Sequence, residues 1–232
     1  MEQTVVVAGV GPGLGAALVR KFSENGGRVA LLARSEAYLT GLTSELSDRG
    51  LLALPTDLAQ PDEIAHAFAQ TRAEFGPIDI LICHASASSW SGIEEISAEE
   101  FERAWRVTVL GAFLCCKEVV GEMIERGNGV ILFTGATSAI RGRKGALGFS
   151  SAKFGLRGLA DSLARELWPK GIHVAHIVID GEIGAAGAPQ DRGEVQLDPD
   201  AIAASYFLLA QQERGAWSFE IDVRPNREDF FV

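Results

Sequence analysis

Residues 4–15 read TVVVAGVGPGLG, a run of valines that passes directly into four alternating glycines. The apolar run suits a buried parallel strand, because such a strand needs apolar side chains on both faces. Leu14, Leu18 and Phe22 follow at helical spacing, so the stretch predicts a strand, a glycine turn and a helix. Glycines let backbone N–H groups approach a pyrophosphate, and a helix N-terminus carries partial positive charge. A bare turn does not require so many glycines, so the stretch indicates a dinucleotide-binding site.

The second predicted strand, residues 28–33, indicates which dinucleotide binds. A strand that ends about 20 residues beyond the glycines normally carries a carboxylate, which binds the ribose hydroxyls of NAD. Arg34 and Ser35 stand at this place instead. The Arg34 guanidinium can pair with a 2′-phosphate and Ser35 can add a hydroxyl donor, whereas the alternative is an ordinary surface arginine. The stretch therefore predicts NADP rather than NAD.

Predicted strands and helices alternate along the rest of the chain. Further strands are expected at residues 51–54, 78–83, 130–133, 172–179 and 217–223. Helices are expected at residues 36–49, from Pro61, from the Ser97/Glu100 capping box to Arg126, at 150–168, and from Asp198-Pro199. The alternation predicts a single Rossmann-type, doubly wound α/β domain over residues 1–232, with a mostly parallel seven-stranded sheet and helices on both faces. Ligands of such sheets bind at the carboxyl ends of the strands.

Charge and cysteine content narrow the classes of partner. Lys and Arg number 21 against 31 Asp and Glu, which gives a formal charge of −10. A scattered acidic surface argues against nucleic acid and anionic membranes as partners. The three cysteines stand in apolar stretches without metal-ligand spacing, so free thiols in a reducing compartment and no metal site are expected. No signal peptide or transmembrane segment is recognised, and a cytoplasmic protein is expected.

The motifs, taken in this order, resemble the short-chain dehydrogenase/reductase family over essentially the whole chain. Gly9, Gly13 and Gly15 have that family's glycine spacing, Asp57-Leu58 matches its adenine-contacting pair, and residues 151–153 (SAK) match the end of its Tyr-x-x-x-Lys signature. The resemblance implies NAD(P) binding and interconversion of carbonyls and alcohols, with a tyrosine as proton donor and a serine, a lysine and an asparagine assisting. The cofactor contacts so expected are Gly9, Gly11, Gly13, Leu14, Gly15, Arg34, Ser35, Asp57, Leu58, Ala85, Lys153, Gly181 and Ile183.

The chain departs from that family at most of its catalytic positions. Phe149 stands four residues before Lys153, where the tyrosine is expected, and a phenyl ring cannot act as an acid. The serine position is Ala136, so Thr137 or Ser138 would supply a hydroxyl only after a small shift in register. The asparagine and threonine positions are also substituted, by Thr108 and Ala185. Of the four catalytic side chains, only the lysine is present in register.

Two further residues are candidates for chemistry. Lys153 lies one helical turn after Phe149, and in the resembling family this lysine holds the nicotinamide ribose. His84 follows the fourth strand, beside the expected nicotinamide, and a histidine can exchange a proton near neutral pH. The alternative for His84 is a ring that only hydrogen-bonds the backbone in place of the family's asparagine.

Residues around this site indicate the substrate and the assembly. Trp90, Phe149 and Phe154 predict an apolar or aromatic small-molecule substrate, although large aromatics are more often core residues. The basic cluster Arg141, Arg143 and Lys144 is expected to be solvated. Residues 182–197 are expected to form a short substrate-side loop that acts as an open or poorly ordered lid. The helices of residues 99–126 and 150–168 carry apolar side chains on more than one face, which predicts a homodimer or homotetramer.

Three functions follow from these observations. The first is an NADP-dependent oxidoreductase acting on a carbonyl, alcohol or quinone-like substrate, in which His84, Thr137 or Ser138, or a water held by Lys153, supplies the proton. The second is a non-catalytic dinucleotide-binding protein that senses or scaffolds. The third is a redox-neutral enzyme on the same fold that uses His84.

Overall fold

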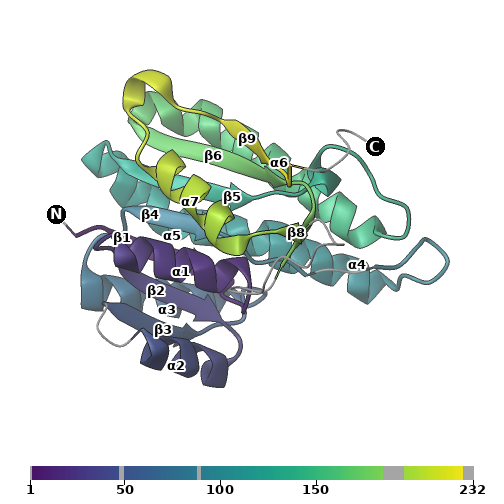
Figure 1. Cartoon of the computed structure of the whole chain (residues 1–232), viewed down its shortest axis with the longest axis horizontal. Helices are drawn as coiled ribbons and strands as arrows, with labels where there is room; N and C mark the ends of the chain where they lie inside the picture. Colours follow the sequence, from purple (N-terminus) through teal and green to yellow (C-terminus); the bar gives the residue numbers. More distant parts are fainter. Residues whose placement is uncertain (1, 47–49, 88–89, 185–195, 227–232) are drawn as a thin grey trace.

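The computed structural model describes residues 2–46, 50–87, 90–184 and 196–226 as one α/β domain built on a seven-stranded sheet (Figure 1). The strand order is β3-β2-β1-β4-β5-β6-β9, and every pair is parallel. Its strands are β1 (Thr4–Ala8), β2 (Arg28–Ala33), β3 (Leu51–Pro55), β4 (Ile80–Cys83), β5 (Gly129–Thr134), β6 (Ile172–Ile179) and β9 (Glu220–Val223). The order reverses between β1 and β4, so a crevice for ligands is expected at their carboxyl ends.

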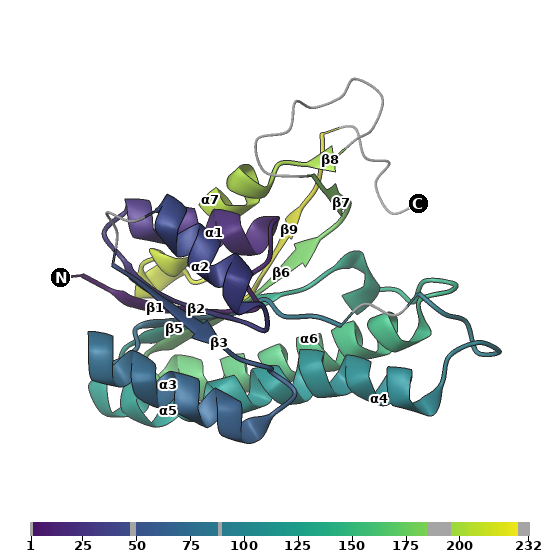
Figure 2. The same cartoon turned by 90° about the horizontal axis from the view of Figure 1, so that it is seen from below.

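Helices cover both faces of the sheet, as Figure 2 shows. One face carries α1 (Leu14–Glu24), α2 (Glu36–Glu45) and α7 (Pro199–Ala210). The other carries α3 (Pro61–Phe75), α4 (Ala98–Trp105), α5 (Gly111–Arg126) and α6 (Leu147–Leu167). Each face has its own apolar core, and the two cores meet the sheet through alternate side chains of the same strands, such as Val5 and Val6. The predicted doubly wound architecture is confirmed.

The structure corrects several expected boundaries. The fourth strand begins at Ile80 rather than Ile78, and the last strand at Glu220 rather than Trp217. The helix expected at residues 36–49 ends at Glu45, and residues 47–49 lie outside the described residues. The long helix to Arg126 is interrupted by a π-helical turn, Arg106–Leu110, which separates α4 from α5. Thr108 in this turn accepts a hydrogen bond from the Ala87 N–H at 3.4 Å, and such turns frequently occur at functional sites.

The expected substrate-side loop at residues 182–197 is described only at its ends. There β7 (Glu182–Ile183) and β8 (Gln196–Leu197) pair in parallel as a small separate sheet. Residues 185–195 lie outside the described residues, so the expectation of an open lid is not tested.

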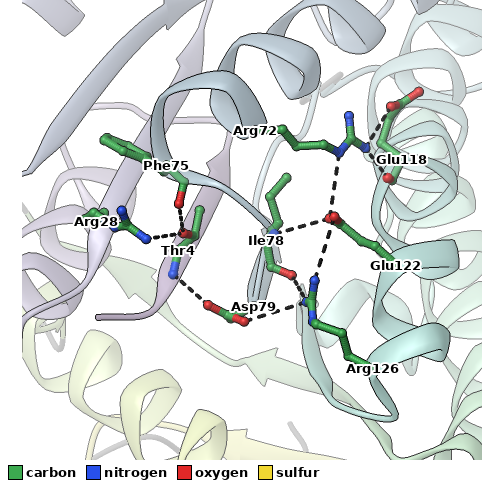
Figure 3. Close-up of polar contacts among 9 residues, drawn as sticks. All are labelled: Thr4, Arg28, Arg72, Phe75, Ile78, Asp79, Glu118, Glu122 and Arg126. Carbon is green, nitrogen blue, oxygen red and sulfur yellow. Dashed lines mark hydrogen bonds and ion pairs between the residues drawn. The ribbon is translucent and has the colours of Figure 1, made fainter. Parts of the chain in front are cut away.

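A polar network closes the opposite end of the sheet, at the amino ends of β1 and β4 (Figure 3). The Glu122 carboxylate of α5 lies between two arginines: Oε1 is 3.8 Å from Arg72 Nε of α3, and Oε2 is 3.7 Å from Arg126 Nη1. Asp79 accepts the Thr4 N–H at 2.9 Å, which joins the two strands to this network. Part-exposed ion pairs of this kind contribute at most about 1 kcal/mol each, so the network orients α3 and α5 rather than dominating stability.

Candidate functional site

A cavity of about 990 Å³ opens at the carboxyl ends of β1, β2 and β4. Its lining residues come from the glycine turn, from the ends of β2, β3 and β4, and from α4. Most of the expected site residues lie there: Gly9, Gly11, Gly13, Leu14, Gly15, Arg34, Ser35, Asp57, Leu58, His84, Ala85 and Ile183. The described lining residues do not include Lys153, Thr137, Ser138 or Gly181.

The glycine turn is shaped for a close backbone approach. Gly9 has a φ of +110°, and a Cβ there would lie 2.4 Å from the Ala85 nitrogen, so only glycine fits. A Cβ on Gly11 or Gly13 would have no neighbour within 4 Å, because these residues border the open cavity. Gly13 caps α1 without a side-chain hydrogen bond, and the first turn of α1 has no acidic residue. The N–H groups at this helix start can therefore hold an anion such as a pyrophosphate.

The end of β2 brings Arg34 and Ser35 to the cavity wall beside Tyr38. Ser35 is also the N-cap of α2, where its hydroxyl accepts the Tyr38 N–H at 3.3 Å. A serine hydroxyl that accepts one hydrogen bond can still donate another. Arg34 and Ser35 are thus placed together at a helix N-terminus, an arrangement that can receive a phosphate.

The segment after β3 is held in place by local hydrogen bonds and by α5. The Asp57 carboxylate accepts the Ala59 N–H at 3.0 Å, and Leu58 is buried. A Cβ on Gly111 would lie 2.5 Å from the Leu58 carbonyl oxygen, so glycine is required for α5 to pass this close. Gly111 thereby helps to set the Asp57-Leu58 wall of the cavity.

A buried hydrogen-bonded cluster stands behind the cavity and centres on Thr134, the last residue of β5. Its hydroxyl oxygen lies 3.1 Å from His84 Nδ1 and accepts a hydrogen bond from the Tyr206 hydroxyl at 2.8 Å. Its carbonyl oxygen accepts a hydrogen bond from Lys153 Nζ at 2.8 Å. Lys153, Thr134 and Tyr206 are buried, and His84 connects the cluster to the cavity wall. The His84 ring therefore bonds a side-chain hydroxyl rather than the backbone.

Burial shifts the proton affinities of these groups. It lowers the pKa of His84 to about 4, and the neighbouring Lys153 charge acts in the same direction. It also lowers the pKa of Lys153 to about 8. Near neutral pH, His84 is therefore uncharged, and Lys153 is mostly protonated but able to release its proton.

Phe149 stands where an acid was expected, and its ring covers Lys153. The Lys153 Nζ lies 5.5 Å from the centre of the Phe149 ring, which packs against Trp90 at 5.4 Å between centroids. The Arg143 guanidinium lies 5.1 Å from the Trp90 ring centre. Trp90 lines the cavity, whereas Phe154 is 44% exposed on α6 and is not among the described lining residues. The aromatic wall is therefore Trp90 with Phe149 behind it.

The two hydroxyls expected to replace the missing serine are placed differently from Thr134. The Thr137 hydroxyl donates a hydrogen bond to the Asp180 carboxylate, which also forms an ion pair with Arg224. Ser138 is buried in the short 3₁₀ turn Thr137–Ala139. Thr134, three residues before Thr137, is the hydroxyl that contacts His84.

Gly181 lies just after β6 with a φ of +139°. A Cβ there would lie 3.2 Å from the Pro225 ring, so Gly181 packs against the segment after β9. Its role as a cofactor contact stays a prediction.

The family model of the short chain dehydrogenases matches residues 3–183 of this chain. The chain belongs to the short-chain dehydrogenase family. A solved short-chain dehydrogenase from Rhodopseudomonas palustris is 34% identical, with a TM-score of 0.83 over 96% of this chain and 98% of that one. A metagenomic short-chain oxidoreductase solved in complex with NADP is 26% identical, with a TM-score of 0.85 over 97% of both chains. An uncharacterized oxidoreductase of Thermotoga maritima is 33% identical over 75% of this chain and 69% of its own length.

Sequence reasoning missed several residues of this short-chain dehydrogenase site, among them Thr134, Tyr206, Glu100 and Arg103. The sequence held a signal for Thr134, because Thr134 is the last residue of β5 and the carboxyl ends of the strands were expected at the site. Tyr206 carries a weaker signal, a single phenol within the apolar helix α7. Glu100 and Arg103 of α4 also line the cavity, and nothing in their spacing marked them.

Three features bear on the class of partner: membrane-spanning helices, metal-ligand clusters and reactive cysteines. Among the residues that the structure describes, no helix is both long and apolar enough to cross a membrane, and no cluster of three potential ligands could hold a metal ion. The cysteines Cys83, Cys115 and Cys116 are free and buried. A hydrogen bond with Cys116 and burial raise the pKa of Cys83, and burial raises that of Cys115, so these two thiols stay protonated.

Proposed function

We propose that this short-chain dehydrogenase is an NADP-dependent oxidoreductase that interconverts a carbonyl and an alcohol, or reduces a quinone-like substrate, with a non-standard proton relay. One observation carries the proposal: a single cavity is lined by the glycine turn, Arg34 and His84, and Thr134 links His84 to the Lys153 ammonium. The 26% identical relative solved with NADP supports the choice of cofactor.

The residues that would hold the cofactor follow the cavity wall. The glycine turn and the start of α1 would bind the pyrophosphate, and Arg34 with Ser35 would bind the 2′-phosphate. Asp57 and Leu58 would border the adenine, and the cavity beside His84 would receive the nicotinamide. Bound NADPH supplies a hydride for the substrate carbon. The protein must then orient the substrate and deliver one proton to its oxygen.

Lys153 is the best proton source in this arrangement. Phe149 has no proton to give, and neutral His84 cannot give one without becoming an anion. The Lys153 ammonium has a pKa lowered to about 8, close to the working pH, which favours general acid catalysis. We propose that its proton reaches the substrate oxygen through a water that Lys153 holds, which leaves a neutral amine that takes a proton back from solvent.

A second candidate function is a non-catalytic dinucleotide-binding protein, and the Phe149 ring between Trp90 and Lys153 favours it. The deciding experiment measures NADPH binding by calorimetry and NADPH oxidation with a panel of ketones, aldehydes and quinones. Tight binding with oxidation of NADPH supports the oxidoreductase. Tight binding without oxidation by any substrate supports the binding protein, and a redox-neutral reaction lost in His84→Ala supports the third function.

The cofactor preference gives a direct prediction. Arg34→Ala should weaken NADPH binding by about 10- to 100-fold, since a charge-assisted hydrogen bond is worth about 1.5–3 kcal/mol. NADH binding should change little, because NADH has no 2′-phosphate. Arg165→Ala is the control, because Arg165 is exposed on α6 and its Nη2 lies 3.2 Å from Asp161 Oδ1, one helical turn away. Equal affinities of the parent protein for NADPH and NADH would refute the assignment.

We also propose that the chain assembles with itself through the helical face that α4, α5 and α6 form. Large apolar side chains are exposed along this face: Phe101, Trp105, Leu110, Phe113, Leu147 and Phe154. Trp105 Nε1 donates a hydrogen bond to Ser151 at 2.9 Å, so α4 and α6 present one continuous surface. A second copy of the same face is the simplest cover for it.

Light scattering at micromolar concentration should therefore give a dimer or tetramer. Phe113→Glu should shift the protein toward the monomer, because it places a charge within an apolar interface. Ile93→Glu should leave the mass unchanged, since Ile93 is exposed outside these helices. A monomeric parent protein contradicts the proposal.

The free buried cysteines support a reducing compartment, and we propose the cytoplasm.

A further inference from the structure

Two helices on opposite faces of the sheet and one neighbouring strand bring side chains to Thr134. Tyr206 comes from α7 on one face, and Lys153 comes from α6 on the other (Figure 2). His84 lies beside Thr134 at the end of the neighbouring strand β4. Tyr206 is fully buried, and its phenol donates the 2.8 Å hydrogen bond to the Thr134 hydroxyl. The phenol, which lies 72 residues after Thr134 in the sequence, and the His84 ring thus meet at one threonine hydroxyl.

The hydrogens of this cluster can be assigned by counting donors and acceptors. The Thr134 hydroxyl has one hydrogen to donate, and the Tyr206 phenol already donates to its oxygen. The remaining neighbour of that oxygen, among the described residues, is His84 Nδ1 at 3.1 Å. If Thr134 donates to Nδ1, the phenol hydrogen, the threonine hydrogen and the Nδ1 lone pair each have a partner. If Nδ1 carried the proton instead, either the threonine or the phenol hydrogen would lack an acceptor among the described residues, which is costly in a buried site.

The charge state of the ring agrees with this assignment. Burial and the Lys153 charge keep His84 neutral near pH 7, with a pKa of about 4, so only one ring nitrogen carries a proton. A neutral ring whose Nδ1 accepts a hydrogen bond carries its proton on Nε2. His84 lines the cavity, and Nε2 makes no hydrogen bond within the described part of the chain.

We propose that Tyr206 and Thr134 are positioning residues that hold His84 in the tautomer with its proton on Nε2, so that this N–H binds the substrate oxygen in the cavity. The substrate part of this inference rests on the proposed oxidoreductase function, whereas the tautomer does not. In carbonyl reduction the Nε2–H stabilises the negative charge that develops on the oxygen and is not itself transferred. The proton that completes the alcohol comes from Lys153, so atoms and charge balance without an imidazolate.

The tautomer can be measured directly by NMR on the full-length protein labelled with ¹⁵N-histidine, with no substrate present. Long-range ¹H–¹⁵N spectra at pH 7.5 separate protonated from unprotonated ring nitrogens, and His84→Gln identifies the signals of His84. The parent protein should show an unprotonated Nδ1 and a protonated Nε2. The reverse pattern would overturn the inference. The measurement is made on the parent protein, and His84→Gln is needed only to assign the signals.

Three variants test the roles of Tyr206 and Thr134. Thr134→Val removes the donor to Nδ1 and should give a mixture of tautomers, and Tyr206→Phe should do the same more weakly. Thr134→Ser keeps the hydroxyl and should restore the parent pattern. Tyr38→Phe makes the same chemical change at the other tyrosine and should leave the His84 signals unchanged. Parent signals in both Thr134→Val and Tyr206→Phe would overturn the positioning role.

Turnover separates this inference from the proposed function. If the protein reduces a carbonyl, Tyr206→Phe should lower kcat by about two- to tenfold, in proportion to the lost fraction of the competent tautomer, while the affinity for NADPH stays the same. An unchanged kcat despite a mixed tautomer would refute the substrate contact of Nε2. If no substrate is ever reduced, the proposed function fails, and the spectra still decide the tautomer.

Discussion

Phe149→Tyr is expected to raise the turnover of NADPH-dependent carbonyl reduction by about 10²- to 10⁴-fold, the usual contribution of a well-placed acid. Phe149 lies one helical turn before Lys153, and the Lys153 Nζ is 5.5 Å from its ring centre. The added phenol would stand beside this ammonium, which favours the phenolate and so lowers the phenol's pKa. The variant would thus complete the Tyr-x-x-x-Lys signature, whose tyrosine is the proton donor that the family resemblance implies.

A matched control for this experiment lies on the same helix. Phe154→Tyr adds the same hydroxyl to an exposed ring of α6, away from the cavity, and should leave turnover unchanged. The measurement is kcat/KM for NADPH oxidation with simple ketones and quinones. A protein that works through His84 alone should gain little from Phe149→Tyr, and a pure binding protein should bind NADPH without turnover in both forms. Either result would count against carbonyl reduction at this site.

Lys153→Met is expected to lower kcat by about 10²- to 10⁴-fold and to remove the main break in the pH profile. The reactive form of Lys153 is the ammonium, whose pKa burial lowers to about 8. With saturating NADPH, the parent kcat should be level below this pH, where the ammonium predominates. Above about pH 8 it should fall about tenfold per pH unit, because the proton needed by the substrate oxygen is lost.

The control is Lys170→Met, at an exposed lysine that precedes the amino end of β6, opposite the cavity. It should keep both the rate and the break near pH 8. Methionine is close in size to lysine, so Lys153→Met should preserve the packing of the buried stem, which a thermal melt can verify. A parent profile that rises through pH 8, or a break that persists in Lys153→Met, would show that another group supplies the proton.

The elements that the sequence predicted correctly are those whose causes are local. The apolar run of β1, the glycines of the turn and the helical spacing of α1 follow one another directly in the sequence. Pro61 begins α3, Ser97 and Glu100 form the capping box of α4, and Asp198 caps α7, as their spacing indicated. Such signals act within about four residues, so they can be read without the fold.

The family also followed from the sequence, because its motifs are short and occur in a fixed order along the chain. The glycine spacing, Asp57-Leu58 and Ser151-Ala152-Lys153 indicated the family, and the alternation of strands and helices predicted the doubly wound sheet. The same reading showed that Phe149 cannot be an acid, since that conclusion needs only the chemistry of the side chain.

Only the tertiary structure showed which hydroxyl contacts the His84 ring. Counting along the chain pointed to Thr137 and Ser138, but Thr137 bonds Asp180 and the contact belongs to Thr134, 50 residues from His84. Tyr206 reaches the same oxygen from a helix on one face, while Lys153 comes from the other face. These contacts depend on the register of β4 against β5 and on the direction of each side chain from its own element. Neither quantity is encoded in the spacing of residues. The amino-acid order therefore predicted the fold and most of the residues that line the cavity, and packing across the sheet decided the proposed proton-transfer site.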